Sequence, residues 1–281
     1  MNLLQIVCVS IIFIGFVIAE IASGRFAALG ASKDDWKIEA AMLLLLLIAI
    51  QPLILVGVYR MGLHYFPGWE NAVAALPVWG MFLILLLTED LTQYWWHRAS
   101  HTPLLWPLHR AHHSAAYMSV RVVYRNNFFY YAMMPGIWIS ATLIYLGFGT
   151  VYVAYVVLKL LVIIAAHSAV RWDEPLYKIR VMHPIMWVVE RTISTPATHY
   201  AHHAITMDDG IGHYKGNYGN FLFLWDVLFG TALITRQFPS RTGLQDDITY
   251  GKESWIAELF FPIFKSKRSH SALGKERIIV E

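Results

Sequence analysis

The chain has 281 residues, of which 57% are hydrophobic and only 15% are charged, and its mean hydropathy is +0.47. Soluble domains carry more charge and less apolar mass, so this composition indicates an integral membrane protein. The formal net charge of +3 is small and the basic residues form no continuous stripe, which argues against a nucleic-acid-binding protein. The single cysteine, Cys8, excludes an intrachain disulfide and a thiolate-rich metal site. Any metal must therefore be held by nitrogen and oxygen.

Three apolar segments precede residue 100. Residues 3–22 are long enough to span a bilayer, and we interpret them as a retained helix rather than a signal peptide, because no basic segment precedes them and no clear cleavage site follows. A second span is predicted over about 39–59. A third apolar helix begins near Leu76 and continues into His97 and His101, so its composition changes from apolar to ligand-bearing within one element.

Two further apolar segments, residues 128–148 and 150–167, are predicted to form a hairpin around Gly147 and Gly149. Beyond His167 the chain is mostly soluble in character. We therefore expect an all-α integral membrane bundle of about four to five transmembrane helices with a cytosolic helical cap that holds a histidine-rich di-metal site. Its expected parts are N-terminal transmembrane helices (1–75), a catalytic region (76–232) and a C-terminal cytosolic or interfacial tail (233–281).

The charges of the loops predict the orientation. Cytosolic loops are enriched in lysine and arginine. The first and third connections are rich in these residues and the second has one, so the N-terminus is expected outside and every clustered histidine on the cytosolic face. His64 falls in the second connection and is excluded from the site. The residues concerned are Arg25, Lys33 and Lys37 in the first, Arg60 in the second, and Arg98, Arg110, Arg121 and Arg125 in the third.

Histidines recur at metal-ligand spacing. An HxxxH pattern is followed by HxxHH, a histidine closes the last predicted span, and a second HxxHH comes later. Residues three or four apart share one face of a helix, so each pattern can direct several imidazoles toward a common point. The proposed ligands are His97, His101, His109, His112, His113, His167, His199, His202 and His203, with His213 less certain and His183 less favoured still.

Nine imidazoles exceed the three or four ligands of one tetrahedral zinc, which implies two metals or a large set of supporting histidines. Two six-coordinate ions held largely by imidazole would leave open positions for dioxygen and substrate, which suits iron. Asp90 lies on the same helical stripe as His97 and is our candidate for a carboxylate that accepts a ring N–H from a ligand, with a simple interfacial charge as the alternative. Asp226 is expected to brace the cap rather than to react.

The ordered motifs resemble the fatty acid hydroxylase superfamily, also called the sterol desaturase family. They are His97-Arg-Ala-Ser-His101, His109-Arg-Ala-His112-His113, His167, Thr195-Pro-Ala-Thr-His199-Tyr-Ala-His202-His203, and Asn217-Tyr-Gly through Trp225-Asp226 to Gly230-Thr231. The resemblance covers roughly residues 80–232. It implies a non-haem di-iron oxygenase that uses dioxygen and two electrons to hydroxylate a C–H bond of a lipid.

Other functions remain open at this point. Within the same chemistry they are desaturation of a lipid or sterol and oxidative cleavage of an alkyl ether; outside it, a membrane zinc hydrolase or a non-catalytic metal carrier. Arg121 and Arg125 are expected either to pair with a lipid headgroup or to act only as positive-inside anchors.

No electron-carrier domain is evident, so the electrons are expected from a separate donor, a ferredoxin or a cytochrome b5-type protein with its reductase. The terminal residues 276–281 lack a dilysine pattern, which favours a bacterial inner membrane over the endoplasmic reticulum.

Overall fold

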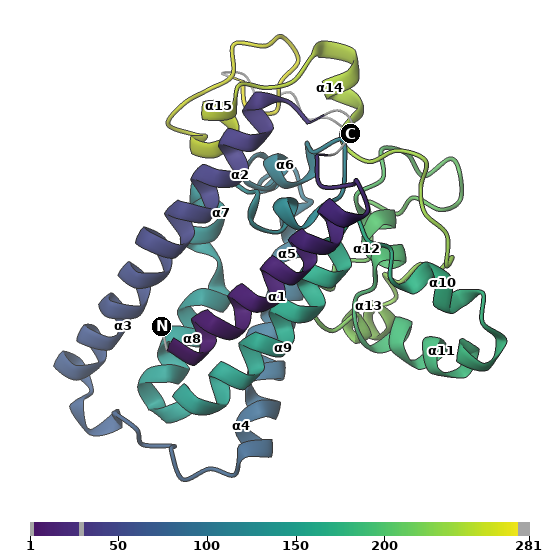
Figure 1. Cartoon of the computed structure of the whole chain (residues 1–281). Helices are drawn as coiled ribbons and strands as arrows, with labels where there is room; N and C mark the ends of the chain where they lie inside the picture. Colours follow the sequence, from purple (N-terminus) through teal and green to yellow (C-terminus); the bar gives the residue numbers. More distant parts are fainter. Residues whose placement is uncertain (1–2, 28–30, 275–281) are drawn as a thin grey trace.

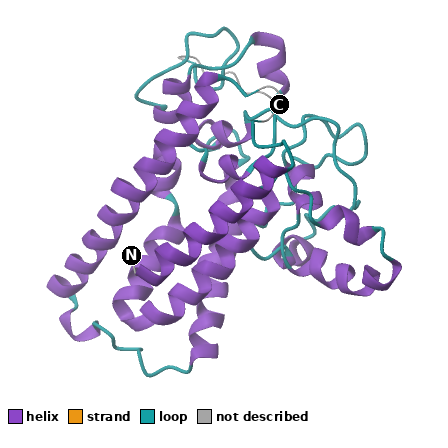
Figure 2. Cartoon of the chain, in the orientation of Figure 1, coloured by secondary structure: helices purple, strands orange, loops and turns teal. Residues whose placement is uncertain are grey.

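The computed structural model describes residues 3–27 and 31–274, and within them it contains helices and two isolated bridges but no β-strand (Figure 2). This confirms the predicted all-α class. The helices are α1 (Leu3–Ala22), α2 (Lys33–Leu45), α3 (Gln51–Tyr65), α4 (Val78–Leu85), α5 (Leu91–Ser100), α6 (Trp106–His113), α7 (Phe128–Met133), α8 (Pro135–Leu143), α9 (Gly149–His167), α10 (Asp173–Tyr177), α11 (His183–Thr192), α12 (Pro196–His202), α13 (Leu224–Phe229), α14 (Gln245–Tyr250) and α15 (Trp255–Phe260).

Three helical runs in the described residues are long and apolar enough to cross a membrane: Leu3–Ala22, Lys33–Tyr65 and Pro135–His167. Only 11% of the apolar window in the first run and 22% of that in the second are buried within the protein. Large aliphatic side chains such as Ile11 and Leu53 are instead exposed. Apolar surface of this extent is compatible with lipid and not with water. The chain is therefore a membrane protein.

The predicted third span corresponds to α4 and α5, which a π-helical turn at Leu86–Asp90 joins into one helix. This helix is not among the three apolar runs, because Glu89, Asp90 and the polar side chains of α5 follow its apolar first half. Pi-helical turns shift the facing of the residues that follow them and are common near functional sites. Here the turn separates the apolar half of the helix from the half that carries His97.

The last two predicted spans lie within one apolar run, which Gly147 interrupts with a backbone φ of 113°. Glycine adopts such a conformation without steric strain. The chain reverses there, since residues on both sides of the turn meet Glu89: a Cβ on Gly136 would lie 2.7 Å from its Oε1 atom, and Lys159 Nζ lies 2.7 Å from the same atom. Helices α8 and α9 therefore run in opposite directions, as in the predicted hairpin.

Different parts of the chain cover the two ends of the helical bundle. At one end, residues 66–77 pack against the hairpin turn, where the Asn71 N–H donates to the Tyr145 carbonyl. At the other end lies the cap, which includes α6, α12, α14 and α15 (Figure 1). The first connection is at the cap end, where Arg25 Nη1 donates to the Ala169 carbonyl at 2.8 Å. The first and third connections thus share one end of the bundle.

Buried ion pairs fasten the C-terminal helices to the cap. Arg110 of α6 pairs with Asp247 of α14 and Glu258 of α15. Arg125 contacts Asp35 of α2 at 2.8 Å and Glu258 at 3.3 Å. Both arginine side chains are only 1% exposed, so each depends on these carboxylates to compensate the loss of water.

Of the two roles expected for Arg121 and Arg125, this network argues against pairing with a lipid headgroup. The Arg125 guanidinium is occupied by the carboxylates just described. Arg121 lies 3.2 Å from Glu39 and stacks over the ring of Trp36, 3.9 Å from its centroid. The two arginines hold α2 and α15 against the segment that follows α6.

The expected C-terminal tail is partly integrated into the protein. Leu259 of α15 is 1% exposed and belongs to the same apolar cluster as Met42 of α2 and Tyr130 of α7. The terminal stretch 276–281 lies outside the described residues. Helix α15 therefore contributes to the core beside α6 and does not merely lie on the membrane.

Removal of Glu258 tests this network. The variant Glu258→Ala leaves Arg110 and Arg125 undercompensated, and we expect a loss of about 3–5 kcal/mol in the free energy of unfolding, measured as a lower melting temperature of the purified protein in detergent. The control Lys178→Ala breaks an exposed pair with Glu174 and should change the melting temperature little. Equal melting temperatures for the two variants would contradict the role given to Glu258.

Candidate metal centre

Four helices deliver the clustered histidines to one place at the cap end of the bundle. Helix α12 shows how local sequence sets this up: Thr195 caps it in a reciprocal arrangement with Thr198, and Pro196 occupies its first turn. Helix α5 carries His97 and ends just before His101, and α9 ends on His167. The remaining histidines are His109, His112 and His113 on α6, His199 and His202 on α12, and His203 directly after it.

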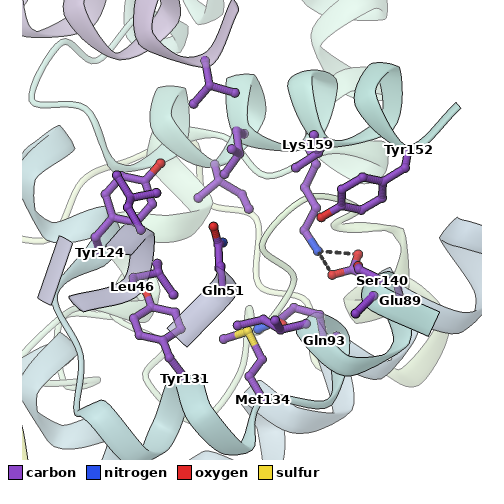
Figure 3. Close-up of a pocket in the computed structure, with 18 of the residues that line it drawn as sticks. Leu46, Gln51, Glu89, Gln93, Tyr124, Tyr131, Met134, Ser140, Tyr152 and Lys159 are labelled. Carbon is purple, nitrogen blue, oxygen red and sulfur yellow. Dashed lines mark hydrogen bonds and ion pairs between the residues drawn. The ribbon is translucent and has the colours of Figure 1, made fainter. Parts of the chain in front are cut away.

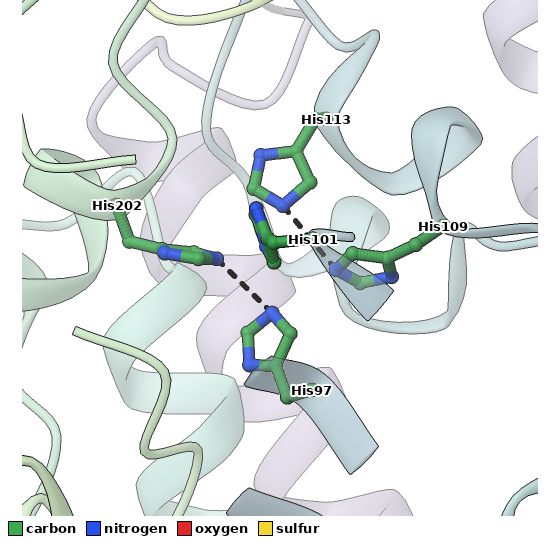
Figure 4. A group of neighbouring side chains, drawn as sticks. All are labelled: His97, His101, His109, His113 and His202. Carbon is green, nitrogen blue, oxygen red and sulfur yellow. Dashed lines mark hydrogen bonds between the residues drawn. The ribbon is translucent and has the colours of Figure 1, made fainter. Parts of the chain in front are cut away.

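The nine predicted ligands come together as two groups, within each of which one nitrogen per ring lies within 4.8 Å of the others. The five-histidine group (Figure 4) contains His97, His101, His109, His113 and His202; the four-histidine group contains His112, His167, His199 and His203.

Each HxxHH motif divides its histidines between the two groups. The first and last histidines of each motif lie in the same group: His109 with His113, and His199 with His203. The middle histidine of each motif, His112 or His202, lies in the other group. The groups are adjacent, since the rings of His113 and His203 are stacked with centroids 4.4 Å apart.

Backbone carbonyls fix the tautomers in the five-histidine group. His97 Nδ1 lies 2.6 Å from the Tyr218 carbonyl and His202 Nδ1 lies 2.7 Å from the Gly216 carbonyl. A carbonyl oxygen only accepts, so Nδ1 carries the proton in both rings and Nε2 carries the lone pair. These two Nε2 atoms nevertheless face each other at 3.0 Å. Two lone pairs therefore point at one location with no proton between them.

The four-histidine group repeats this arrangement. His167 Nδ1 lies 2.8 Å from the Ile163 carbonyl and His112 Nδ1 lies 3.1 Å from the Arg125 carbonyl. Their Nε2 atoms approach to 3.5 Å, and His199 Nε2 lies 2.9 Å from that of His167. Both groups thus aim unprotonated nitrogens inward.

Burial keeps these rings neutral. It lowers the pKa of six clustered histidines outside the membrane-spanning segments well below the usual range, and the neighbouring imidazoles lower the pKa further. The six are His109, His112, His113, His199, His202 and His203.

The donor set fits a metal ion in each group. A metal–imidazole bond of about 2.1 Å places neighbouring ligand nitrogens about 3.0–3.4 Å apart at right-angled or tetrahedral geometry. The Nε2 contacts within the two groups lie between 2.9 and 3.5 Å. His101 Nε2 is also buried and has no hydrogen-bond partner among the described residues. Facing lone pairs of neutral rings repel unless a cation lies among them.

Asp90 does not accept a ring N–H from a histidine, which corrects the expected role. Its Oδ2 atom accepts from the Trp225 indole at 2.8 Å and from the Leu222 N–H at 3.3 Å. Asp226 accepts from the backbone N–H groups of Tyr218, at 2.8 Å, and Gly219, at 2.6 Å. The two aspartates thus shape the loop whose Tyr218 carbonyl orients His97. Backbone carbonyls take the place expected for a carboxylate.

His213 belongs to neither group, contrary to its inclusion among the less certain ligands. Its Nε2 atom lies 3.2 Å from the Thr231 carbonyl, and its ring fills the space beside Gly216, where an added Cβ would lie 2.1 Å from Nε2. It therefore supports the loop that contacts His202. His183 is exposed and bonds to the Tyr177 carbonyl, and His64 is exposed at the opposite end of the bundle.

Sequence reasoning did not identify Glu20, which lies near the end of the first predicted span. This carboxylate is fully buried at the end of α1. It accepts from the Ala169 N–H at 2.8 Å and the Ser168 hydroxyl at 3.0 Å, directly after His167, and from Ser119 and Val120 on the third connection. Its position as an isolated acid in the last turn of an apolar helix was the available signal, but the partners are about 100 and 150 residues away.

A cavity of about 630 Å³ connects the histidines to the interior of the bundle. Residues from both groups line it: His97 and His109 from the first, His112 and His167 from the second. Most of the other lining residues are apolar or aromatic, among them Leu46, Tyr131 and Met134 (Figure 3), and α3, α8 and α9 each contribute to the wall. An apolar molecule of lipid-chain dimensions held there would meet both groups.

Comparison with known proteins identifies the family. Residues 82–231, more than half of the chain, match the fatty acid hydroxylase family, and this region contains all nine clustered histidines. The chain is also 25% identical over 159 residues to the alkylglycerol monooxygenase of Xenopus tropicalis, in an alignment that covers 53% of this chain and 29% of that relative. The matched part thus spans less than a third of the relative's length. No solved structure gives a significant match. The extent of the family match, together with the arrangement of the histidines, shows that the chain belongs to the fatty acid hydroxylase family.

Proposed function

We propose that this protein is a membrane-bound non-haem di-iron oxygenase that hydroxylates a C–H bond of a lipid, with a fatty acyl chain, a sterol or a polar lipid as substrate. The observation that carries the proposal is the pair of histidine groups, each with inward lone pairs, at the end of an apolar cavity within a membrane protein. Membership of the fatty acid hydroxylase family and the name of the monooxygenase relative support it.

The five-histidine group would hold one iron ion and the four-histidine group the other. When bound, the ions would supply the reductive activation of dioxygen that protein side chains cannot perform. The overall reaction balances when one oxygen atom enters the C–H bond, the other leaves as water, and two electrons and two protons are consumed.

The protein's own residues supply position and a dry environment. The carbonyls of Tyr218, Gly216, Ile163 and Arg125 hold four of the rings in fixed orientations. The apolar cavity excludes water from the reacting carbon and aligns an extended chain with both groups. Hydroxylation, desaturation and ether cleavage would differ in how the cavity wall positions the reacting carbon relative to the histidine groups.

The electrons would come from a separate donor, a ferredoxin or a cytochrome b5-type protein with its reductase. We place the site on the cytosolic face, because the lysine- and arginine-rich connections lie at the cap end, and we favour a bacterial inner membrane over the endoplasmic reticulum.

Cleavage of an alkyl ether is the second candidate, favoured by the name of the relative, alkylglycerol monooxygenase. Hydroxylation next to an ether oxygen gives an unstable hemiacetal and then an aldehyde, so the same chemistry serves both. Desaturation of a lipid or sterol would give an alkene. A zinc hydrolase would need neither oxygen nor electrons.

Metal analysis tests the two groups. We expect the purified protein to contain about two iron ions per chain, one for each group. His109→Ala and His199→Ala, one from each group, should each lose half of the iron or more, because each removes an inward nitrogen. His64→Ala and His183→Ala, both exposed and outside the groups, should keep it. One zinc per chain and no iron would contradict the proposal.

Lipid analysis tests the reaction. Cells that express the wild-type protein should accumulate a lipid heavier by one oxygen atom, derived from labelled dioxygen, and cells that express His109→Ala should not. Mass spectrometry of extracted and supplied lipids separates an alcohol from an alkene or an aldehyde. Unchanged lipids across all three candidate classes, with iron present in the protein, would count against an oxygenase.

A further inference from the structure

A charged pair lies in the wall of the otherwise largely apolar cavity. Lys159 Nζ of α9 lies 2.7 Å and 2.6 Å from the two carboxylate oxygens of Glu89 (Figure 3). Both side chains line the cavity, and both are only 9% exposed. Ionisable groups at membrane depth are costly and commonly mark a functional site. Neither residue belongs to the histidine groups.

The Glu89–Lys159 pair lies at a similar distance along the chain from both histidine groups. Glu89 precedes His97 by eight residues along one helix, and Lys159 precedes His167 by eight residues along another. At 1.5 Å per residue this separation is about 12 Å. The pair and the histidines thus mark two points along one cavity.

The pair retains hydrogen-bonding capacity toward the cavity. An ammonium group has three donors, and the described acceptors within hydrogen-bond distance of Lys159 all belong to one carboxylate; Asp90 Oδ1 is farther away, at 3.9 Å. Glu89 Oε2 also accepts from the Tyr155 hydroxyl, whereas among the described residues Oε1 accepts from Lys159 alone and keeps a lone pair. Gly136, opposite, has no side chain that would cover Oε1, and an added Cβ would meet this atom at 2.7 Å. The side chains of Gln93 and Ser140 lie in the same wall (Figure 3).

The balance of charge selects the kind of ligand. Two acidic side chains, Glu89 and Asp90, lie within 4 Å of a single ammonium group, so an anionic lipid group would meet net repulsion. A hydroxyl group meets no such repulsion. It can accept from Lys159 and donate to Glu89, which uses the donor and the acceptor of the pair together.

We propose that Glu89 and Lys159 bind the hydroxyl group of a neutral lipid and thereby select a carbon about 12 Å away for reaction at the histidine groups. The position of oxidation rests on the proposed function, whereas the binding of the hydroxyl group does not. The pair also links the π-helical turn before α5 to α9, so a purely structural role must be separated by experiment.

Binding of three chain-matched probes to the purified full-length protein in detergent makes this separation: hexadecan-1-ol, hexadecane and hexadecanoate. The double variant Glu89→Gln with Lys159→Met removes both charges with little change in volume, which folded proteins commonly tolerate. We expect the wild-type protein to prefer the alcohol to both other probes. In the double variant the preference for alcohol over alkane should fall about tenfold or more, since hydrogen bonds to charged groups are lost.

Leu160→Ala is the matched control, because Leu160 lines the same cavity beside the pair. It should change the binding of alcohol and alkane alike. An undiminished preference for alcohol in the double variant, or a wild-type protein that binds alkane or carboxylate as well as alcohol, would overturn the inference. Selective binding of the alcohol without oxygen insertion would instead contradict only the proposed function, and oxygen insertion without selectivity only this inference.

Discussion

The constraint on which the cap depends is that neutral imidazoles face each other with their lone pairs, and these lone pairs repel. Four backbone carbonyls fix ring protons on Nδ1 and so leave Nε2 bare in His97, His202, His112 and His167. Without a cation this geometry is unfavourable, and with one it becomes a set of bonds. Because the rings come from four separate helices, metal binding would also join α5, α6, α9 and α12, and it would couple folding of the cap to metal loading.

Much of the site could be predicted because helical periodicity acts locally. Spacings of three and four residues on short helices indicated which histidines share a face, and all nine predicted ligands meet. The division into two groups could not be predicted in the same way. Neighbours such as His112 and His113 diverge by about 100° around the helix, so each motif serves two centres. Which ring joins which centre is determined only by how α5, α6, α9 and α12 are placed around the histidines.

The incorrect expectations for Asp90, Arg121 and Arg125 concern charged residues whose partners are distant in the chain. Arg125 pairs with Asp35 and Glu258, 90 and 133 residues away, and Asp90 bonds to Trp225, 135 residues away. A charge in a membrane protein must find a partner, but the sequence does not indicate which one. Length and hydropathy alone describe the predicted third span poorly for a related reason: α4 and α5 combine an apolar half with a polar half that meets the protein's own cap.

Glu20 links α1 to the site through hydrogen-bond donors that follow it in the chain by 99 to 149 residues. The Ala169 N–H, one of its donors, is 149 residues farther along, and the Ser168 hydroxyl beside it is equally remote. During synthesis Glu20 therefore precedes all of its donors: Ser119 and Val120 come about 100 residues later, and its contacts are complete only once Ser168 and Ala169 have been made. A chain cut before Ser168 would contain the whole of α1 and yet leave its carboxylate without two of its donors.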